Sequence, residues 1–491
     1  MIAEPPGPGS RAAIGACLLV MLLALAALRF HWIDEPFDFD VTLYAVLGHE
    51  MLAGKPLYTE TWDHKPPAIY ATFALAELVA GYGPHAVYLL NVLAAGASLL
   101  GVYAATLGLS RSRAASLWAA AVWTIVSGDP WLEANQPNAE VFMNAFTVWA
   151  LVFALRLDRA GAQAAVAAGA LLGLGSLYKT VLAVHALAFA AAHVAVVGIR
   201  GLGRALMIPG MVGAVWLVTF LYFAVGGRAV DFWEATVTYN RYYAGNVIAN
   251  LAQLREPAKL FPASVAILVP LALLSAFGLG GGRESDRRGT ASWIAYCLAT
   301  GAAVFLPGRL YLHYQQLWFP PLIVGAGTAI AALGRRAAWL VGGAVLAYLA
   351  QHELSALRFS GEEISSRKYG TQLYSVSRRL GERLDRELAP GATFYNWGNQ
   401  VGLCFFSGRR PAAGNIALWP MSHGPLAAKL TERTLADLER NRPEVIVVSK
   451  WHVQAGESHP VYRWIRERYR QGPGGDLGSF EILRPVAPGA R

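Results

Sequence analysis

Three ionisable residues mark the first polar stretch after a hydrophobic N-terminal segment: Asp40, Asp63 and Lys65. They lie in FDFDVTLYAVLGHEMLAGKPLYTETWDHKPPAIYA, residues 37–71. A carboxylate can accept the proton of an attacking hydroxyl group. A lysine can hold phosphate oxygens through charge-assisted hydrogen bonds. A base combined with such cations is what group transfer from a phosphate-linked donor requires.

Asp40 also has a purely structural interpretation. It is the first residue of DVTLYAVLGHEML, just before the amphipathic pattern that begins at Val41, where an aspartate is typical of a helix N-cap. A catalytic role is favoured by the lysine that follows in the same loop and by the acids and cations of later loops. Tyr44, Asp63 and His64 are further candidates for the site within this first loop.

A second acidic segment, SGDPWLEANQPNAEVFMNAF, leads into another apolar run. Glu140 and Asn144 are one helical turn apart at the start of that run, and Asn138 comes just before them. Glu140 is therefore a second catalytic candidate. The alternative is that this carboxylate only stabilises the dipole of the helix whose first turn it occupies.

The segment PGRLYLHYQQLWFPP, residues 307–321, supplies further polar groups. If an α-helix begins here, Arg309, His313 and Gln316 share one face, at i, i+4 and i+7. Such a stripe at the mouth of an apolar helix predicts the wall of a cavity. The alternative is an interfacial belt, with Tyr314 at headgroup level and the arginine reaching toward lipid phosphates.

The elements that position these residues follow from the composition. Hydrophobic residues form 55% and charged residues 15% of the 491 residues, whereas soluble proteins average about 25% charged residues. The mean hydropathy of +0.38 predicts a polytopic membrane protein. The net charge of +9 fits cytoplasmic loops and lipid headgroups, and no basic low-complexity arm points to nucleic acid. The three cysteines predict no disulfide framework and no zinc-type spacing.

Eleven apolar runs recur along the chain, which predicts about eleven transmembrane helices. The runs cover residues 12–30, 85–109, 114–128, 139–155, 162–178, 181–199, 206–227, 261–281, 290–307, 310–334 and 337–353.

Arginines set the orientation of these runs. They cluster after every even-numbered run, first at Arg111 and Arg113. The positive-inside rule therefore places the N-terminus in the cytoplasm and residues 31–84 outside. Lys179 and Arg309 then lie on the outer side, where the positive-inside rule does not account for basic residues. There they could bind the phosphate of a lipid-linked sugar.

The orientation requires residues 65–83, KPPAIYATFALAELVAGYG, not to cross the membrane. We expect a short juxtamembrane helix at the outer interface, begun by Pro66 and Pro67. The alternative is an ordinary short transmembrane helix, which would reverse the orientation of most of the arginine clusters.

The chain changes character near residue 355. Leucines recur at helical spacing in SSRKYGTQLYSVSRRLGERLDREL, and LTERTLADLERNRP predicts another helix. ATFYNWG, EVIVVSK and SFEILRP predict short strands. We therefore expect a transmembrane catalytic domain over 1–354 and a small extracytoplasmic α/β domain over 355–491.

Several of these motifs together resemble a known family. The chain resembles the polyprenyl-phosphate-sugar-dependent glycosyltransferases of the GT-C superfamily. Four motifs carry the resemblance: FDFD…DHKPP, an N-x-E-x-F loop, GLGSLYK and GRLYLHYQQLWFPP. The likeness is greatest to families 39 and 83, which include lipid A aminoarabinose transferase and relatives of the protein O-mannosyltransferases. It covers residues 12 to about 335 and is strongest for DHKPP and the HY segment.

The resemblance implies a role for individual residues. Asp40, four residues ahead of Tyr44, would be the catalytic base, and Lys65 would contact the carrier phosphate. Glu140 matches the acid of the second outer loop, where relatives often have aspartate. His313 and Tyr314 match the polar positions of the segment GRLYLHYQQLWFPP and, with Lys65 and Arg309, would bind the donor phosphate. The chain departs from the aminoarabinose transferases at Leu43, where that group has arginine, which implies a different sugar or acceptor.

The implied activity is inverting sugar transfer from a polyprenyl-phosphate carrier at the outer face of a bacterial inner membrane, with the C-terminal domain periplasmic. The acceptor could be a lipid A or lipopolysaccharide core, another cell-envelope glycan or a protein, and the use of a divalent cation is left open. The alternative from another class is a polytopic transporter or lipid flippase, which would also carry charges near the membrane.

Overall fold

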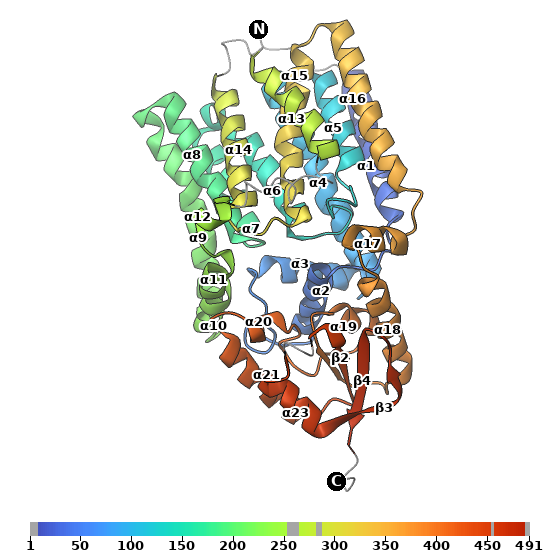
Figure 1. The fold of residues 1–491 in the computed structure, drawn as a ribbon. Coiled ribbons are helices and arrows are strands. Elements are labelled where there is room, and N and C mark those ends of the chain that lie inside the picture. The colour runs from blue at the N-terminus through green and yellow to red at the C-terminus, as the bar shows by residue number, and fades with distance from the viewer. Residues whose placement is uncertain (1–7, 253–264, 281–286, 453–455, 487–491) are drawn as a thin grey trace. The chain divides into compact units, whose positions relative to one another are not determined.

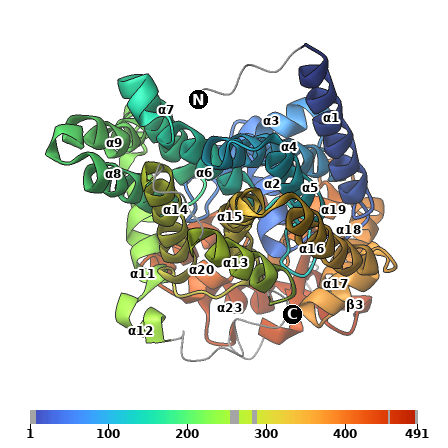
Figure 2. The same ribbon diagram turned by 90° about the horizontal axis from the view of Figure 1, so that it is seen from above.

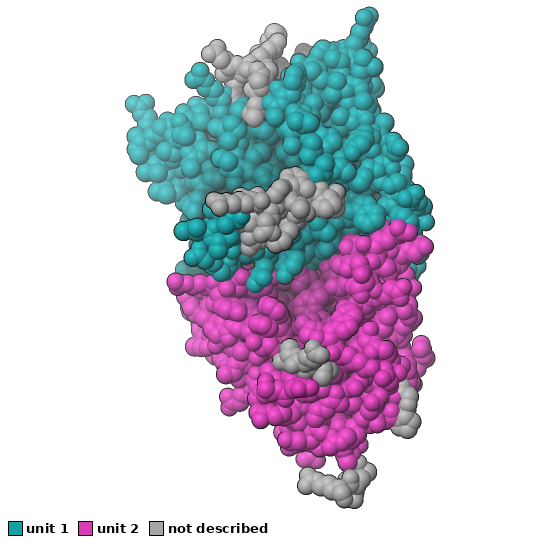
Figure 3. Space-filling model, viewed as in Figure 1, with its two compact units in different colours: residues 1–34, 88–219, 244–360 teal, residues 35–87, 220–243, 361–491 magenta. Residues whose placement is uncertain are grey.

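The structure is a computed structural model that describes residues 8–252, 265–280, 287–452 and 456–486 (Figure 1). The chain is mostly helical and contains one small sheet. It divides into two compact units that interleave along the sequence (Figure 3). Unit 1 comprises residues 1–34, 88–219 and 244–360, and unit 2 comprises residues 35–87, 220–243 and 361–491.

Unit 1 is a helical bundle whose core is formed by the buried faces of the apolar runs. In it α5 packs against α1, α15 and α16 (Figure 1 and Figure 2). Helices suit this sequence because an α-helix pairs its backbone groups internally, as an apolar environment demands. The elements that lie wholly or mainly in this unit are α1 (Pro8–Phe30), α4 (Pro84–Ser110), α5 (Arg113–Val126), α6 (Ala139–Ala154), α7 (Leu157–Ser176), η1 (Thr180–Ala183), α8 (Val184–Val197), η2 (Ile199–Gly201), α9 (Leu202–Val225), α12 (Val247–Ala252), α13 (Val265–Gly280), α14 (Arg287–Phe305), η7 (Leu312–Trp318), α15 (Phe319–Ala332) and α16 (Arg335–Ala356).

Small residues allow neighbouring helices of this bundle to approach closely. A Cβ atom on Gly169 in α7 would lie 2.5 Å from the backbone oxygen of Ile208 in α9. Close approach at small residues is typical of helices that pack in a membrane, where burial of apolar surface cannot drive association.

Each predicted apolar run corresponds to helical structure, although residues 261–264 and 281 lie outside the described residues. Within the described part, four helical segments are long and apolar enough to cross a membrane: Arg11–Phe30, Pro84–Ser110, Thr180–Val197 and Ile199–Val225. The protein is therefore a membrane protein, as predicted. The number of crossings and their orientation stay predictions.

Unit 2 begins with two short helices from the first predicted outer loop, α2 (Phe39–Leu52) and α3 (Ala68–Ala80). They pack together at Gly48, where a Cβ atom would lie 2.9 Å from the backbone nitrogen of Ala74. Helix α3 follows Pro66 and Pro67 directly, as expected. Its 13 residues reach about 20 Å, which is short of a bilayer core of about 30 Å.

The rest of unit 2 is an α/β segment built on a sheet of order β1-β2-β4-β3. Strand β1 runs parallel to β2, and β4 is antiparallel to both of its neighbours. The remaining elements of the unit are α10 (Ala229–Trp233), the π-helix η3 (Glu234–Tyr239), α11 (Asn240–Ala244), α17 (Gly361–Tyr369), α18 (Leu373–Glu387), β1 (Phe394–Trp397), α19 (Gly402–Ser407), α20 (Trp419–Ser422), α21 (Ala427–Asn441), β2 (Val445–Ser449), η8 (Lys450–His452), α23 (Pro460–Arg468), β3 (Tyr469–Asp476) and β4 (Phe480–Pro485).

The C-terminal segment packs with residues 35–87 of unit 2. Arg410 makes two hydrogen bonds of 2.9 Å to Glu50 in α2. The backbone nitrogen of Trp62 donates to the carbonyl of Gly414 at 3.1 Å. The predicted division at residue 355 therefore stays a prediction, while in the structure the C-terminal residues share a compact unit with residues 35–87 and 220–243.

Candidate functional site

Asp40 lies in the first turn of α2 and is not the cap. The N-cap is Asp38, whose Oδ1 accepts a hydrogen bond from the backbone nitrogen of Val41 at 2.8 Å. The sequence-based placement of Asp40 at the N-cap is thus wrong by two residues. Because Asp38 satisfies the helix terminus, the carboxylate of Asp40 is not required for that role.

Lys65 is the partner of Asp40. Its Nζ atom lies 3.1 Å from Oδ1 of Asp40 and 4.9 Å from the centre of the Tyr44 ring. Asp40 and Lys65 have 22% and 12% of their side chains exposed, so both remain within reach of a ligand. Tyr44 is fully buried. The predicted neighbourhood of Asp40, Tyr44 and Lys65 is therefore present within unit 2.

The backbone around Lys65 is held from two sides. The hydroxyl of Tyr58 donates to the carbonyl of Lys65 at 2.8 Å, and the side-chain nitrogen of Asn240 donates to the carbonyl of His64 at 2.6 Å. Tyr58 itself is fully buried. The DHKPP segment is thus fixed through its carbonyl groups, which leaves the lysine side chain to make its own contacts.

Asp63 is a buried anchor of the same segment. Its carboxylate lies 2.9 Å from Nδ1 of His64 and accepts a hydrogen bond of 2.5 Å from the hydroxyl of Tyr70. Burial alone would raise the pKa of Asp63, but the charges of His64 and Lys65 and these hydrogen bonds hold it well below the usual range. Asp63 therefore stays ionised and supports the cations beside it.

A second cluster lies in unit 1. Oε1 of Glu140, which is buried in the first turn of α6, lies 2.6 Å from Nζ of Lys179. The same Nζ lies 3.3 Å from the centre of the Tyr314 ring. Asn138, also buried, is the N-cap residue of α6. The structure thus brings the two predicted outer residues Glu140 and Lys179 into direct contact, although their roles remain predictions.

The segment around His313 differs from the predicted α-helix. Residues Leu312–Trp318 form the 3₁₀-helix η7, and Arg309 precedes it in non-helical backbone. In a helix with three residues per turn, His313 and Gln316 share a face, but Arg309 does not belong to it. The predicted stripe of three residues is therefore wrong for Arg309.

His313 has a partner that the sequence did not indicate. Its Nδ1 lies 2.8 Å from Oε2 of Glu133, a residue with a positive φ of 57° in the loop before α6. The backbone oxygen of Gln316 accepts a hydrogen bond of 3.2 Å from Asn144. Glu133 was visible in the acidic segment of the sequence, but its unusual backbone conformation, which aims it at His313, has no sequence signal.

The candidate residues therefore form two clusters, each inside one unit. Asp40, Tyr44, Asp63, His64 and Lys65 belong to unit 2, whereas Asn138, Glu140, Lys179, Arg309, His313, Tyr314 and Gln316 belong to unit 1. Of the described residues, the carboxylate and histidine group with the spacing of a metal site is a different one, Asp129, His352 and Glu353.

No protein-family model and no curated protein matches the sequence. Solved structures do match. The structure of ArnT from Cupriavidus metallidurans bound to undecaprenyl phosphate aligns with a TM-score of 0.63 and 15% identity, covering 98% of this chain and 99% of that one.

Two other structures are similar over most of this chain. The oligosaccharyltransferase AglB from Archaeoglobus fulgidus, in complex with an inhibitory peptide and a dolichol-phosphate, gives a TM-score of 0.54 at 14% identity and covers 97% of this chain and 74% of that one. The arabinofuranosyltransferase AftD from Mycobacteria aligns with a TM-score of 0.50 at 15% identity. The alignment covers 97% of this chain and 40% of that one. The chain thus has the GT-C fold expected from its motifs, and at these identities the likeness concerns the fold.

Proposed function

We propose that this protein is an inverting glycosyltransferase that moves a sugar from a polyprenyl-phosphate carrier to an acceptor at the outer face of a bacterial inner membrane. The observation that carries the proposal is the partly exposed pair of Asp40 and Lys65, in a chain with the GT-C fold. The neighbours that hold undecaprenyl phosphate and a dolichol-phosphate support a carrier of the same chemical class.

Asp40 is the general base in this proposal. It takes the proton of the acceptor hydroxyl while that oxygen forms a bond to the anomeric carbon. The bond from the anomeric carbon to the phosphate oxygen breaks at the same time, and the polyprenyl phosphate leaves with the electron pair. A single displacement inverts the anomeric centre, whereas retention would require a nucleophilic carboxylate and a covalent intermediate.

Lys65 stabilises the charge that builds on the departing phosphate. Before the donor binds, Lys65 is paired with Asp40 at 3.1 Å. The donor phosphate is a diester with one negative charge, which it shares over two oxygens, and it gains a second charge as the bond to the anomeric carbon breaks, so it competes with Asp40 for the ammonium group. Donor binding therefore draws Lys65 from Asp40 and leaves the carboxylate able to accept a proton.

Within unit 1, Glu140 and Lys179 form a second candidate site, which could orient an acceptor. Because Lys179 compensates its charge at 2.6 Å, Glu140 remains an ionised acceptor of hydrogen bonds from sugar hydroxyl groups. Arg309, His313 and Tyr314 of the same unit are candidates for contacting a donor phosphate, and Asn138 and Gln316 are further candidates for the site. The acceptor is a lipid, a cell-envelope glycan or a protein.

Transfer of radiolabel from a polyprenyl-phosphate sugar to membrane extract tests the proposal on purified protein in lipid nanodiscs. Asp40→Asn should lower turnover about 10²–10⁴-fold, the usual loss when a general base is removed. Glu60→Gln removes an exposed carboxylate from the same loop and serves as the matched control. Near-normal turnover by Asp40→Asn would remove Asp40 from its role.

Two further measurements separate the alternatives. Transport of labelled donor across a vesicle membrane without transfer to any acceptor would favour a flippase over an enzyme. Comparison of cell-envelope glycans between wild-type and deletion strains would identify the acceptor class, because the modified glycan should lose one sugar.

A further inference from the structure

Three potential metal ligands meet near the end of α16 in unit 1. Asp129 lies in the loop after α5, and His352 and Glu353 lie in the last turns of α16; each places one ligand atom within 4.8 Å of the others. Nε2 of His352 is 3.7 Å from Oδ2 of Asp129. Two ligands of a tetrahedral zinc ion are about 3.4 Å apart, given bonds of about 2.0–2.2 Å. The spacing is therefore close to that of ligands sharing one cation.

The ligand atoms lack the partners that buried polar atoms normally have. Within the described part of the chain, Oδ2 of Asp129, Nε2 of His352 and Oε1 of Glu353 are shielded from solvent and have no hydrogen-bond partner outside this group of three. Asp129 is 0% exposed and Glu353 is 8% exposed. Two carboxylates buried this close repel one another unless a cation or a proton lies between them. A metal ion would satisfy all three atoms.

The nearby arginine does not fill this role. Arg29 of α1 is buried, and it donates from Nε to Asn91 at 3.0 Å and from Nη2 to the carbonyl of Ser127 at 2.5 Å. Its third nitrogen, Nη1, makes no hydrogen bond to a described residue, so Arg29 attracts Glu353 through its charge without a hydrogen bond. Two carboxylates and one guanidinium leave one negative charge, which still favours a divalent cation.

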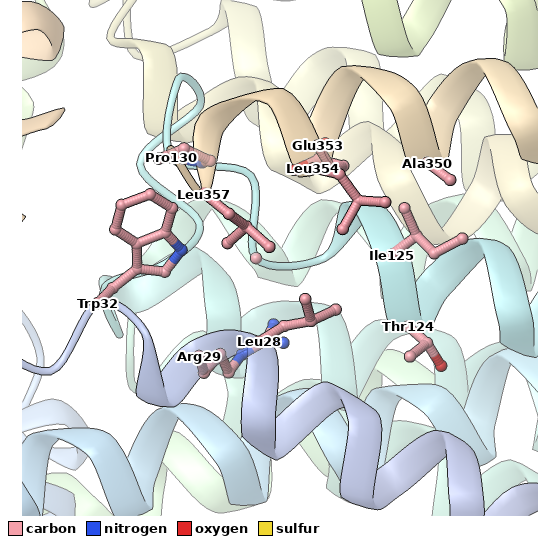
Figure 4. A pocket seen from close by; sticks show the side chains of 11 residues that line it. Leu28, Arg29, Trp32, Thr124, Ile125, Pro130, Ala350, Glu353, Leu354 and Leu357 are labelled. Carbon is pink, nitrogen blue, oxygen red and sulfur yellow. The ribbon is translucent and has the colours of Figure 1, made fainter. Parts of the chain in front are cut away.

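A cavity of about 220 Å³ reaches one of the three ligands, Glu353 (Figure 4). Glu353 and Arg29 line it, and the rest of its wall is mainly apolar, with Leu28, Trp32 and Leu357 among the contributors (Figure 4). A cavity of this size has room for water molecules, one of which can complete the coordination of a metal held by three protein ligands.

We propose that Asp129, His352 and Glu353 bind a divalent transition metal, zinc or manganese. One imidazole and two carboxylates suit both ions. The ion joins α16 to the loop after α5, and Oδ1 of Asp129 organises that loop by accepting a hydrogen bond of 2.6 Å from the backbone nitrogen of Leu132. The next residue, Glu133, holds His313. The metal site itself is independent of the proposed sugar transfer.

Metal content of the full-length protein in nanodiscs tests this site without any sugar substrate. The protein is stripped with a chelator, equilibrated with Zn²⁺ or Mn²⁺ and freed of excess ion before elemental analysis. Wild type should retain about one ion per chain, whereas His352→Ala and Glu353→Gln should each retain at least about tenfold less. His85→Ala, which removes an exposed histidine elsewhere, is the matched control and should retain the ion.

Thermal unfolding and spectroscopy complete the test. The same ion should raise the melting temperature of wild type and of His85→Ala, but not that of Glu353→Gln, which keeps the shape of the side chain. With Co²⁺ as the probe, X-ray absorption should detect one imidazole ligand, and His352→Ala should lose it. Failure of folded wild-type protein to retain either ion, or unchanged retention in both variants, would overturn the site in favour of a shared proton.

Discussion

The side chains of Asp40 and Lys65 are partly exposed, and this exposure determines how much their replacement changes the stability of the protein. Because 22% and 12% of the two side chains are exposed, water screens the charges only in part, and replacing either residue should cost about 1–3 kcal/mol of folding free energy. Thermal unfolding should show that both variants still fold. Effects on turnover can then be attributed to chemistry and binding.

Lys65→Ala should chiefly weaken use of the donor. Loss of a charge-assisted hydrogen bond to phosphate costs about 1.5–3 kcal/mol, which corresponds to roughly a 10- to 150-fold rise in the KM for the polyprenyl-phosphate sugar. Steady-state kinetics with varied donor would measure it. Lys55→Ala is the control from the same loop, since Glu50 keeps Arg410 as a partner there. An unchanged KM in Lys65→Ala would argue against the phosphate contact.

Asp63→Asn should destabilise the protein in a pH-dependent way. The pKa of Asp63 lies below its usual range in the folded protein, so its contribution is complete above the unfolded-state pKa of about 4 and is lost as the pH falls through the folded pKa. Melting temperatures at pH 7 should show wild type well above the variant, and the gap should narrow below pH 4. A gap that widens in acid would contradict this account.

At the scale of the elements, α2 and α3 are in close contact at Gly48, which has no side chain to separate their backbones. Gly48→Leu places a side chain where even a Cβ atom would be 2.9 Å from the backbone of Ala74. Overpacking of this kind costs about 1–3 kcal/mol or more, and the shift of α2 should also displace Asp40. Melting temperature and turnover should both fall. Gly203→Ala in α9, with nothing within 4 Å of the added atom, is the control and should leave both unchanged.

Periodicity located most elements and missed those that depend on tertiary contacts. The apolar runs and the strands β1, β2 and β4 follow from local pattern. Strand β3 was missed because its sequence YRQGPGGD contains glycine and proline, which weaken the strand signal. The 3₁₀ geometry of η7 was missed because its residues fit an α-helical pattern equally well, and this displaced Arg309 from the predicted face.

For the candidate site too, the sequence indicated which residues to consider but not which of them are in contact. Charged residues in apolar surroundings identified Asp40, Lys65, Glu140 and Lys179, because such residues are costly without a function or a partner. Which of them pair could not be predicted. Lys65 and Asp40 are separated by an entire helix, and Glu133 reaches His313 only through its positive φ.

At the scale of the whole molecule, the C-terminal segment supports residues 35–87. Glu50 is fully buried, and both Arg410 and Lys55 compensate its charge. Burial would raise the pKa of Glu50, but these partners hold it below its usual value. Arg410→Ala should cost about 1–3 kcal/mol, because it removes two hydrogen bonds while Lys55 remains. Chemical unfolding would measure this loss, and Glu50→Gln combined with Arg410→Ala should cost less than the sum of the two single changes.

The interleaved segments of unit 2 have a consequence for how the protein is made. Its first segment, residues 35–87, leaves the ribosome long before residues 361–491, which supply Arg410 and the partner of Trp62. Contacts this distant in sequence form late. The segment that carries Asp40 and Lys65 therefore waits through most of synthesis for its packing partners, and a nascent chain halted before residue 361 should expose it to proteases and quality control.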